Sequence, residues 1–389
     1  MGGPLQAAIS AIPWTQAQQV PGPFLNYADP FNGRPPFDVS TFPRPMTVLT
    51  NEQNMRPAYA QDWNFTIQRS FASSYLLDVR YVGTKGTHLP RFVEANPAVY
   101  GPGATAQNAD QRRIYAGCPA TPGPCTFASV GLLTNSTNST YHAGQVSVSR
   151  QFASGLGFLA SYTYSKTLDY VSSLNLSGSA PRLVSGENDL AQNPFDLAAE
   201  HGPSLFDARH RLAVSAMYEL PRLQTSGHVA RAILDGWQIN GIALLSSATP
   251  FTIYDSANVA LQGSHPEISG FSEARPDVVG DPNAGPHTPE QWISPSAFRR
   301  LDPLTEAGQF GNAGRNIARG PAYGSLDVGL NKTFLLAENV SLQFRAESFN
   351  VTNHPNFGLP VNDLASPNFG RILESGPPRL MQFALKLLF

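Results

Sequence analysis

Apolar and polar residues alternate at every second position in nine segments of the chain. In residues 145–152, for example, Val146 and Val148 alternate with Ser147 and Ser149. A period of two is typical of a β-strand with one apolar and one polar face, whereas an amphipathic helix repeats about every 3.6 residues. We therefore predict an all-β, antiparallel protein with strands at residues 59–68, 75–82, 145–152, 157–166, 209–221, 235–255, 324–334, 339–350 and 379–389.

The connectors between these strands alternate in length. The short ones are residues 70–74, 153–156, 222–234 and 335–338, and the long ones are residues 83–144, 167–208, 256–323 and 351–378. Transmembrane β-barrels have short periplasmic turns and long extracellular loops, and a tilted strand of about 9–11 residues crosses a bilayer. The alternation therefore favours a transmembrane β-barrel over a soluble β-sandwich or propeller, in which loop lengths are mixed.

Aromatic residues stand at many of the strand ends, as expected of the two aromatic girdles of a membrane barrel. They are Tyr59, Tyr81, Tyr164 and Tyr254 beside the long connectors, and Phe71, Phe152, Phe158, Phe334 and Phe389 beside the short ones. If the short turns are periplasmic, the last strand runs inward and ends at the periplasmic face. Only four of the 26 basic residues are lysine, which fits the cost of charge on a lipid-facing surface.

The charge balance excludes a nucleic-acid-binding protein. The 389 residues carry 26 Lys and Arg against 28 Asp and Glu, whereas nucleic-acid binders show a basic surplus. No run of 18 apolar residues predicts a transmembrane helix, and the first residues lack the pattern of a secretory signal. We expect the chain to be a piece of a longer protein. Residues 1–58 are then an extracellular loop or part of an upstream strand region, with room for a tenth strand, and residues 59–389 are the barrel.

The two cysteines of the chain, Cys118 and Cys125, lie in the long connector at residues 83–144. In an oxidising extracellular loop such a pair is expected to form a disulfide that closes a small loop. The alternative is two free thiols in a cytosolic protein. A zinc site would need further ligands at close spacing, and the nearest histidine, His142, is remote in the sequence.

No motif in the chain predicts an enzyme. Residues 155–160 match G-x-G-x-x-A, but they follow a short turn and start a strand, so we interpret them as a turn and not as a dinucleotide site. Neither G-x-S-x-G nor a P-loop occurs. We therefore expect no catalytic, cofactor-binding or metal-binding residues.

Two groups of polar residues are interpreted as structural or lumen-facing and not as catalytic or metal sites. Glu200, His201, Asp207 and His210 fit no known metal-ligand spacing, and we expect Asp207 to pair with Arg209 or Arg211 at the barrel rim. Polar positions within the strands would face the lumen, where they would tune a pore or contact a plug domain. These are Asp78, Arg80, Arg211, Glu219, Asp327, Arg345 and Glu347.

Six short motifs in the barrel region carry a family resemblance. They are residues 207–216 (DARHRLAVSA), 235–242 (DGWQINGI), 247–252 (SATPFT), 319–323 (RGPAY), 326–332 (LDVGLNK) and 345–357 (RAESFNVTNHPNF). In this order and spacing they resemble the C-terminal barrel of TonB-dependent receptors. The particular likeness is to the Oar-like type, which carries a carboxypeptidase-regulatory-like domain. The C-terminal Phe389 resembles the terminal aromatic signal that the barrel-assembly machinery reads.

The resemblance implies a bacterial outer-membrane receptor of about 22 strands, with a signal peptide and a plug domain that contacts TonB. TonB–ExbB–ExbD would drive uptake of an unknown extracellular ligand through that plug. Nine strands leave two sheet edges unpaired, so we expect a C-terminal fragment without its plug. Two further hypotheses stay open, namely a non-energised outer-membrane channel or adhesin of ten strands and a secreted β-sandwich that binds glycans.

Overall fold

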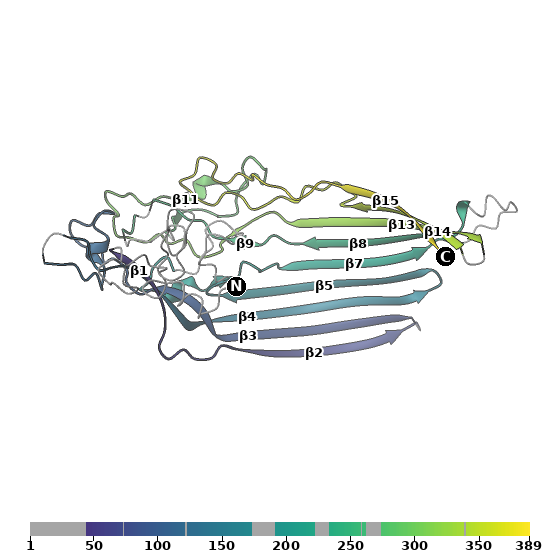
Figure 1. The fold of residues 1–389 in the computed structure, drawn as a ribbon, viewed down its shortest axis with the longest axis horizontal. Coiled ribbons are helices and arrows are strands. Elements are labelled where there is room, and N and C mark those ends of the chain that lie inside the picture. The colour runs from purple at the N-terminus through teal and green to yellow at the C-terminus, as the bar shows by residue number, and fades with distance from the viewer. Residues whose placement is uncertain are drawn as a thin grey trace, which may run out of the picture.

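The computed structural model describes residues 44–72, 74–120, 123–172, 191–221, 233–257, 259–261, 274–337 and 340–389. Nine long strands form one antiparallel sheet in which each strand pairs with the next long strand along the chain (Figure 1). They are β2 (Tyr59–Phe71), β3 (Tyr75–Glu94), β4 (Phe127–Ala153), β5 (Leu156–Asp169), β7 (His210–Glu219), β8 (Trp237–Ser246), β13 (Tyr323–Ala337), β14 (Val340–Phe349) and β15 (Leu380–Leu388). The nine predicted strands are confirmed. In Figure 1 the long connectors gather at one end of the sheet and the short turns at the other.

Two strands extend well beyond the prediction. Residues 83–94 continue β3 and residues 127–144 begin β4, although the sequence pattern predicts a connector there. The two extensions pair with each other, for example Phe92 with Leu133. These residues are rich in Gly, Ser, Thr and Asn, so no apolar alternation marks them as strand. The two extensions reach past the sheet, and there Phe92 and Leu133 form a small buried cluster against which Leu49 and Met55 pack.

The sequence leaves space for a tenth strand within residues 1–58. Among the described residues 44–58 there is only one short strand. Strand β1 (Met46–Asn51) runs parallel to the first residues of β4, from Phe127 to Leu133. It therefore joins the extension at the long-loop end and adds no further strand to the edge of the main sheet. The rest of the predicted N-terminal region, residues 1–43, lies outside the described residues.

The turn between β4 and β5 accounts for the glycine motif at residues 155–160. Ser154 and Gly155 both have positive φ angles, 51° and 80°, as the tight two-residue hairpin turn requires. A Cβ atom on Gly155 would lie 2.9 Å from the carbonyl oxygen of Glu219. The turn interpretation of this motif is confirmed, and glycine serves both the backbone conformation and the close approach of β7.

The remaining elements are short and lie in the connectors. They are β6 (Gly202–Pro203), β9 (Pro250–Phe251), β10 (Asp277–Val278), β11 (Phe298–Arg299), β12 (Ala318–Arg319) and the 3₁₀ turns η2 (Asp110–Arg112), η3 (Leu197–Glu200) and η4 (Pro295–Ala297). Among the described residues, no helix has the length and apolar character needed to cross a membrane.

The strand register sorts the side chains of the sheet onto two different faces. One row joins Val79, Val146, Tyr162, Leu212 and Leu245 across five strands. We call the face that carries this row the apolar face. The neighbouring row joins Arg80, Gln145, Thr163, Arg211 and Ser246, and it lies on the opposite face, which we call the polar face.

Within the described part of the chain, no second layer covers the apolar face. Phe65 and Ile67 on β2 are 64% and 57% exposed, and Phe383 and Leu385 on β15 are 69% and 70% exposed. A soluble sandwich would bury such side chains against another sheet. A membrane strand instead exposes them to lipid, so the face has the distribution expected of a β-barrel exterior.

Candidate functional site

The aromatic girdles are present at both ends of the apolar face, with one correction. Tyr59, Tyr81 and Tyr164 are exposed at the long-loop end, and Phe71 is exposed at the short-turn end. Tyr254, which was expected in the girdle at the long-loop end, is buried, and its amide donates to the carbonyl of Asn362. The strand ends at Ser246, before the proline at position 250, and the chain then turns into the loops.

The seven strand residues expected to face a lumen all lie on the polar face. Register places Asp78 and Arg80 beside each other there, and they form an ion pair of 3.0 Å. The Gln68 amide donates to the same Asp78 carboxylate at 2.6 Å. Farther along the sheet, Gln382 donates to Glu347 from the neighbouring strand. Asp78 and Arg80 are thus paired with each other on the polar face, and none of the seven residues lies on the apolar one.

The polar face also holds an apolar patch. Leu159, Met217 and Ile242 lie on neighbouring strands and are 46%, 36% and 59% exposed. They line a hollow of about 490 Å³ together with Asn240 and Asp327. Side chains of this kind, exposed on an otherwise polar face, indicate a surface that another part of the protein covers.

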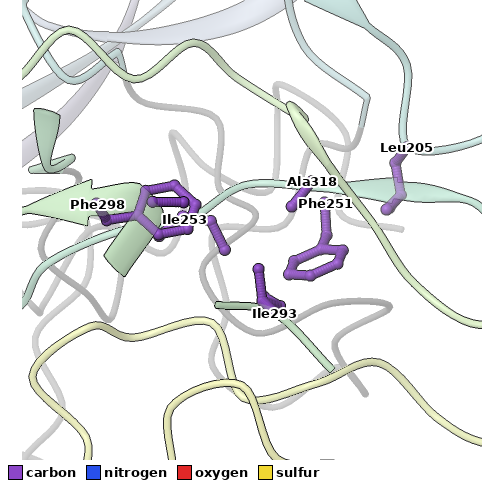
Figure 2. Close-up of a cluster of buried hydrophobic side chains, with 7 residues drawn as sticks. Leu205, Phe251, Ile253, Ile293, Phe298 and Ala318 are labelled. Carbon is purple, nitrogen blue, oxygen red and sulfur yellow. The ribbon is translucent and has the colours of Figure 1, made fainter. Parts of the chain in front are cut away.

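The loops at the long-loop end have a hydrophobic core. Side chains from four stretches of connector, residues 191–209, 247–257, 274–322 and 350–379, pack together, and we call these stretches the loop assembly. Figure 2 shows Leu205, Phe251, Ile253, Ile293, Phe298 and Ala318 of this core. Two short ladders reinforce it, one pairing β9 with β12 and one pairing β10 with β11. The loops therefore form a defined structure at the long-loop end of the sheet.

Buried arginines fasten the loop assembly to the end of β5. Arg315 forms an ion pair with Asp169, the last residue of β5, and its Nη2 donates to the Asp169 carbonyl at 2.8 Å. Its other nitrogens donate to the Ser172 hydroxyl and the Glu200 carbonyl, each at 3.0 Å. Arg275 pairs with the Glu200 carboxylate in turn. Each of these ionic side chains is at most 6% exposed, so the network lies inside the protein.

Asp207 joins the loop assembly to the start of β7. Its carboxylate accepts from Arg209 and Arg319, each at 2.8 Å, and from the amide of Thr167 at 2.8 Å. Burial favours the neutral carboxyl, but these three hydrogen bonds outweigh burial and hold the pKa of Asp207 below its ordinary 3.8. The structure contains the predicted pair between Asp207 and Arg209.

The other members of that sequence cluster have separate partners. Glu200 pairs with Arg275, His201 packs against Tyr170, and His210 hydrogen-bonds Tyr162. In the described part of the chain, no group of three or more His, Cys, Asp or Glu side chains is placed to hold a metal ion.

Replacing Asp207 with asparagine tests the role of its charge. A carboxylate whose pKa is lowered in the folded protein stabilises fully above its unfolded pKa, and this stabilisation is lost as the pH falls through the lowered value. We expect D207N to lose about 2 kcal/mol at pH 7 and to depend less on pH below about 4. Calorimetric unfolding at pH 7 and pH 3 measures both effects. Parallel pH dependence in the variant and the wild type would contradict the assignment.

Cys118 and Cys125 are joined by a disulfide in the connector between β3 and β4.

Phe389, the proposed assembly signal, follows β15 at the short-turn end and is 97% exposed. Its role in assembly stays a prediction.

Arg275 and Arg315 do not stand out in the sequence. A lone arginine in a Gly- and Pro-rich connector belongs to no periodic pattern, and its partners are far away in the sequence. One general signal is present, because arginine makes up most of the basic residues. The guanidinium group can make several hydrogen bonds at fixed geometry, which suits buried ion pairs in loops.

Known proteins give one family match and several similar folds. A family model described as "Outer membrane beta barrel domain" matches residues 4–382. No curated protein matches the sequence. The solved structures with a similar fold include the outer membrane transporter YddB from Escherichia coli (10% identity, 88% of this chain, 34% of that chain, TM-score 0.43).

Two further similar structures are the ferripyoverdine receptor of the outer membrane of Pseudomonas aeruginosa (12% identity, 86% of this chain, 27% of that chain, TM-score 0.38) and the siderophore receptor PiuA from Acinetobacter baumannii (9% identity, 87% of this chain, 29% of that chain, TM-score 0.38). The chain thus spans 27–34% of the length of these three proteins. The family model matches nearly the whole chain, and the antiparallel sheet exposes an apolar face suited to lipid. The chain therefore belongs to the outer membrane beta barrel domain family of the bacterial outer membrane.

Proposed function

We propose that the chain is the C-terminal part of the barrel of a TonB-dependent receptor of the Oar-like type. The complete receptor would take up an extracellular ligand, driven by TonB–ExbB–ExbD through a plug domain outside this chain. Its role is binding and transport, not catalysis. The observation that carries the proposal is a membrane sheet of nine strands whose two edges lack strand partners among the described residues.

The two edges call for further strands. Strand β2 is exposed along its whole length, from Tyr59 to Phe71, and β15 is exposed from Leu380 to Leu388. In a bilayer every backbone amide and carbonyl has to be paired within the protein, because lipid offers no hydrogen bonds. We propose that residues 59–389 close into a barrel of about 22 strands with strands upstream of this chain. Residues 1–58 would belong to the long-loop end, where β1 already lies.

The apolar patch on the polar face favours a plugged receptor over an open channel. In a water-filled pore Leu159, Met217 and Ile242 would stay in contact with water. A domain inside the barrel would cover them and bury their apolar surface. The polar residues around them, among them Asp327 and Glu347, would then contact that domain.

Isolating the protein from bacterial outer membranes provides a test of this function. An antibody against the chain isolates the protein from outer membranes, and peptide mass spectrometry reads its sequence. We expect peptides from further barrel strands and from a plug domain, and a closed conductance in planar bilayers. A protein without plug peptides that forms an open pore would refute the receptor and support the non-energised channel.

The disulfide tests which end of the sheet faces outward. If the long-loop end is extracellular, a membrane-impermeant maleimide should label Cys118 and Cys125 on intact cells only after reduction. The C118S variant serves as the control, because its single remaining thiol should react without reductant. Labelling of the wild type before reduction would show free thiols, and labelling only in broken cells would reverse the orientation.

A further inference from the structure

The charges on the apolar face are all of one sign. In the membrane part of the nine strands, the register places Arg69, Lys85, Arg150, Lys166 and Lys332 on the apolar face, together with His142 and His210. None of the described Asp and Glu residues in this part of the strands lies on that face, and Glu94 stands beyond it in the extension of β3. They lie on the polar face, at Asp62, Asp78, Asp169, Glu219, Asp327 and Glu347. Lys and Arg suit this face because their long apolar stems reach the headgroup region, where anionic lipid attracts the charge.

Four of these groups form one patch at the long-loop end. His142 on β4 stands directly opposite Lys166 on β5, and His210 on β7 stands opposite Tyr164. Lys85 on β3 is opposite Thr140, and His142 is opposite Gly83. Lys85 therefore lies two residues farther from the membrane centre than the position opposite His142. Side chains opposite each other on antiparallel strands lie about 5 Å apart at Cβ, and diagonal ones about 7–8 Å. Lys85, His142, Lys166 and His210 are therefore neighbours, and we call them the cationic patch.

The histidines of the patch are held with one ring nitrogen toward the protein. The Nδ1 of His142 lies 2.8 Å from the Tyr81 hydroxyl, and the Nδ1 of His210 lies 2.7 Å from the Tyr162 hydroxyl. When each tyrosine donates to Nδ1, the ring carries its proton on Nε2. Each Nε2–H is then a donor for an oxygen atom outside the protein.

The two lysines of the patch are available as well. Lys85 and Lys166 are exposed, and neither forms an ion pair with a described residue. Lys332 at the short-turn end differs. Its ammonium donates to the carbonyls of Ile233 and Asp235 and lies 5.1 Å from the ring centre of Trp237. It is 2% exposed, so this cation is used within the protein.

We propose that the cationic patch binds the phosphorylated headgroup of an outer-membrane lipid. A phosphate group carries negative charge and only accepts hydrogen bonds at neutral pH, so it matches two ammonium groups and two imidazole N–H donors. Directly below the patch, the apolar face continues with Val79, Val146 and Tyr162, along which acyl chains can lie. The occupant is a lipid and not a soluble anion, because the patch faces the bilayer side of the sheet.

Binding of diphosphoryl lipid A to the intact protein, isolated from outer membranes in non-ionic detergent, tests the proposal. We expect the K85Q/K166Q variant to bind about 25-fold more weakly than the wild type, from about fivefold per lysine at an anionic lipid surface. The K85R/K166R variant keeps both charges and should restore binding. Titration followed by native mass spectrometry measures the affinities, and heat-modifiable migration on gels verifies folding of each variant.

The matched control removes two cations from the opposite end of the same face. The R69Q/R150Q variant should bind within about twofold of the wild type, because its cations lie roughly 30 Å away, beyond the Debye length. Inorganic phosphate at millimolar concentration should not displace the lipid. Equal losses in the two glutamine variants, unchanged binding in K85Q/K166Q, or displacement by inorganic phosphate would each overturn the proposal.

Discussion

Replacing Arg315 with alanine is expected to open the loop assembly while leaving the membrane sheet intact. The substitution removes one partner of the buried pair with Asp169 and the bonds to Ser172 and Glu200. Loss of one partner from a buried ion pair typically costs about 3–5 kcal/mol, because the other charge stays buried without compensation. Cleavage of the loops by thermolysin should accelerate by about 100-fold or more, since cleavage follows the population of the opened form.

The matched control is another arginine of the same assembly. Arg299 pairs with Asp277 and Glu306, but its side chain is 47% exposed. Exposed pairs contribute about 0–1 kcal/mol, so R299A should accelerate cleavage by less than about fivefold. Fragments identified by mass spectrometry show where cleavage occurs. Equal rates in R315A and R299A, or new cleavage within β4 and β5, would contradict a local role for Arg315.

The strands and the loops differ in how much of each the sequence could predict. The strands were predictable because each of them displays the same contrast, lipid on one face and polar surroundings on the other, at every second residue. Val146 and Ser147 show this contrast in adjacent positions. The loop assembly obeys no such period. Arg315 and Asp169 are 146 residues apart, and only the folded chain brings them together.

The cationic patch could be predicted less well than the strands and better than the loop assembly. All four of its residues stand in or beside predicted strands, but their shared face follows only from the pairing register. Lys166 and His142 are opposite each other because the two-residue turn between β4 and β5 is followed by a register shift between Arg150 and Ala153. The scarcity of lysine suggested that lipid-facing positions avoid it. In the structure three of the four lysines, Lys85, Lys166 and Lys332, lie on that face, at its ends.

Arginine substitutions at Val146 and Ser147 are expected to have very different costs. Val146 lies on the apolar face midway between His142 and Arg150, whereas Ser147 lies on the polar face opposite Asp78. An arginine near the bilayer midplane on the lipid face costs about 2–4 kcal/mol. S147R should cost less than about 1 kcal/mol, because the new cation faces a carboxylate. Urea unfolding of the intact protein in phospholipid vesicles measures the free energies.

A tryptophan at position 146 separates a lipid-facing surface from a packed protein core. Both environments penalise V146R, so that variant alone does not distinguish a membrane barrel from a soluble sandwich. In a packed core the larger ring would force neighbouring side chains apart and cost about 1–3 kcal/mol. Fluid acyl chains adapt to its shape, so V146W should unfold within about 0.5 kcal/mol of the wild type. A large loss of stability in V146W would mean that protein, and not lipid, covers the apolar face.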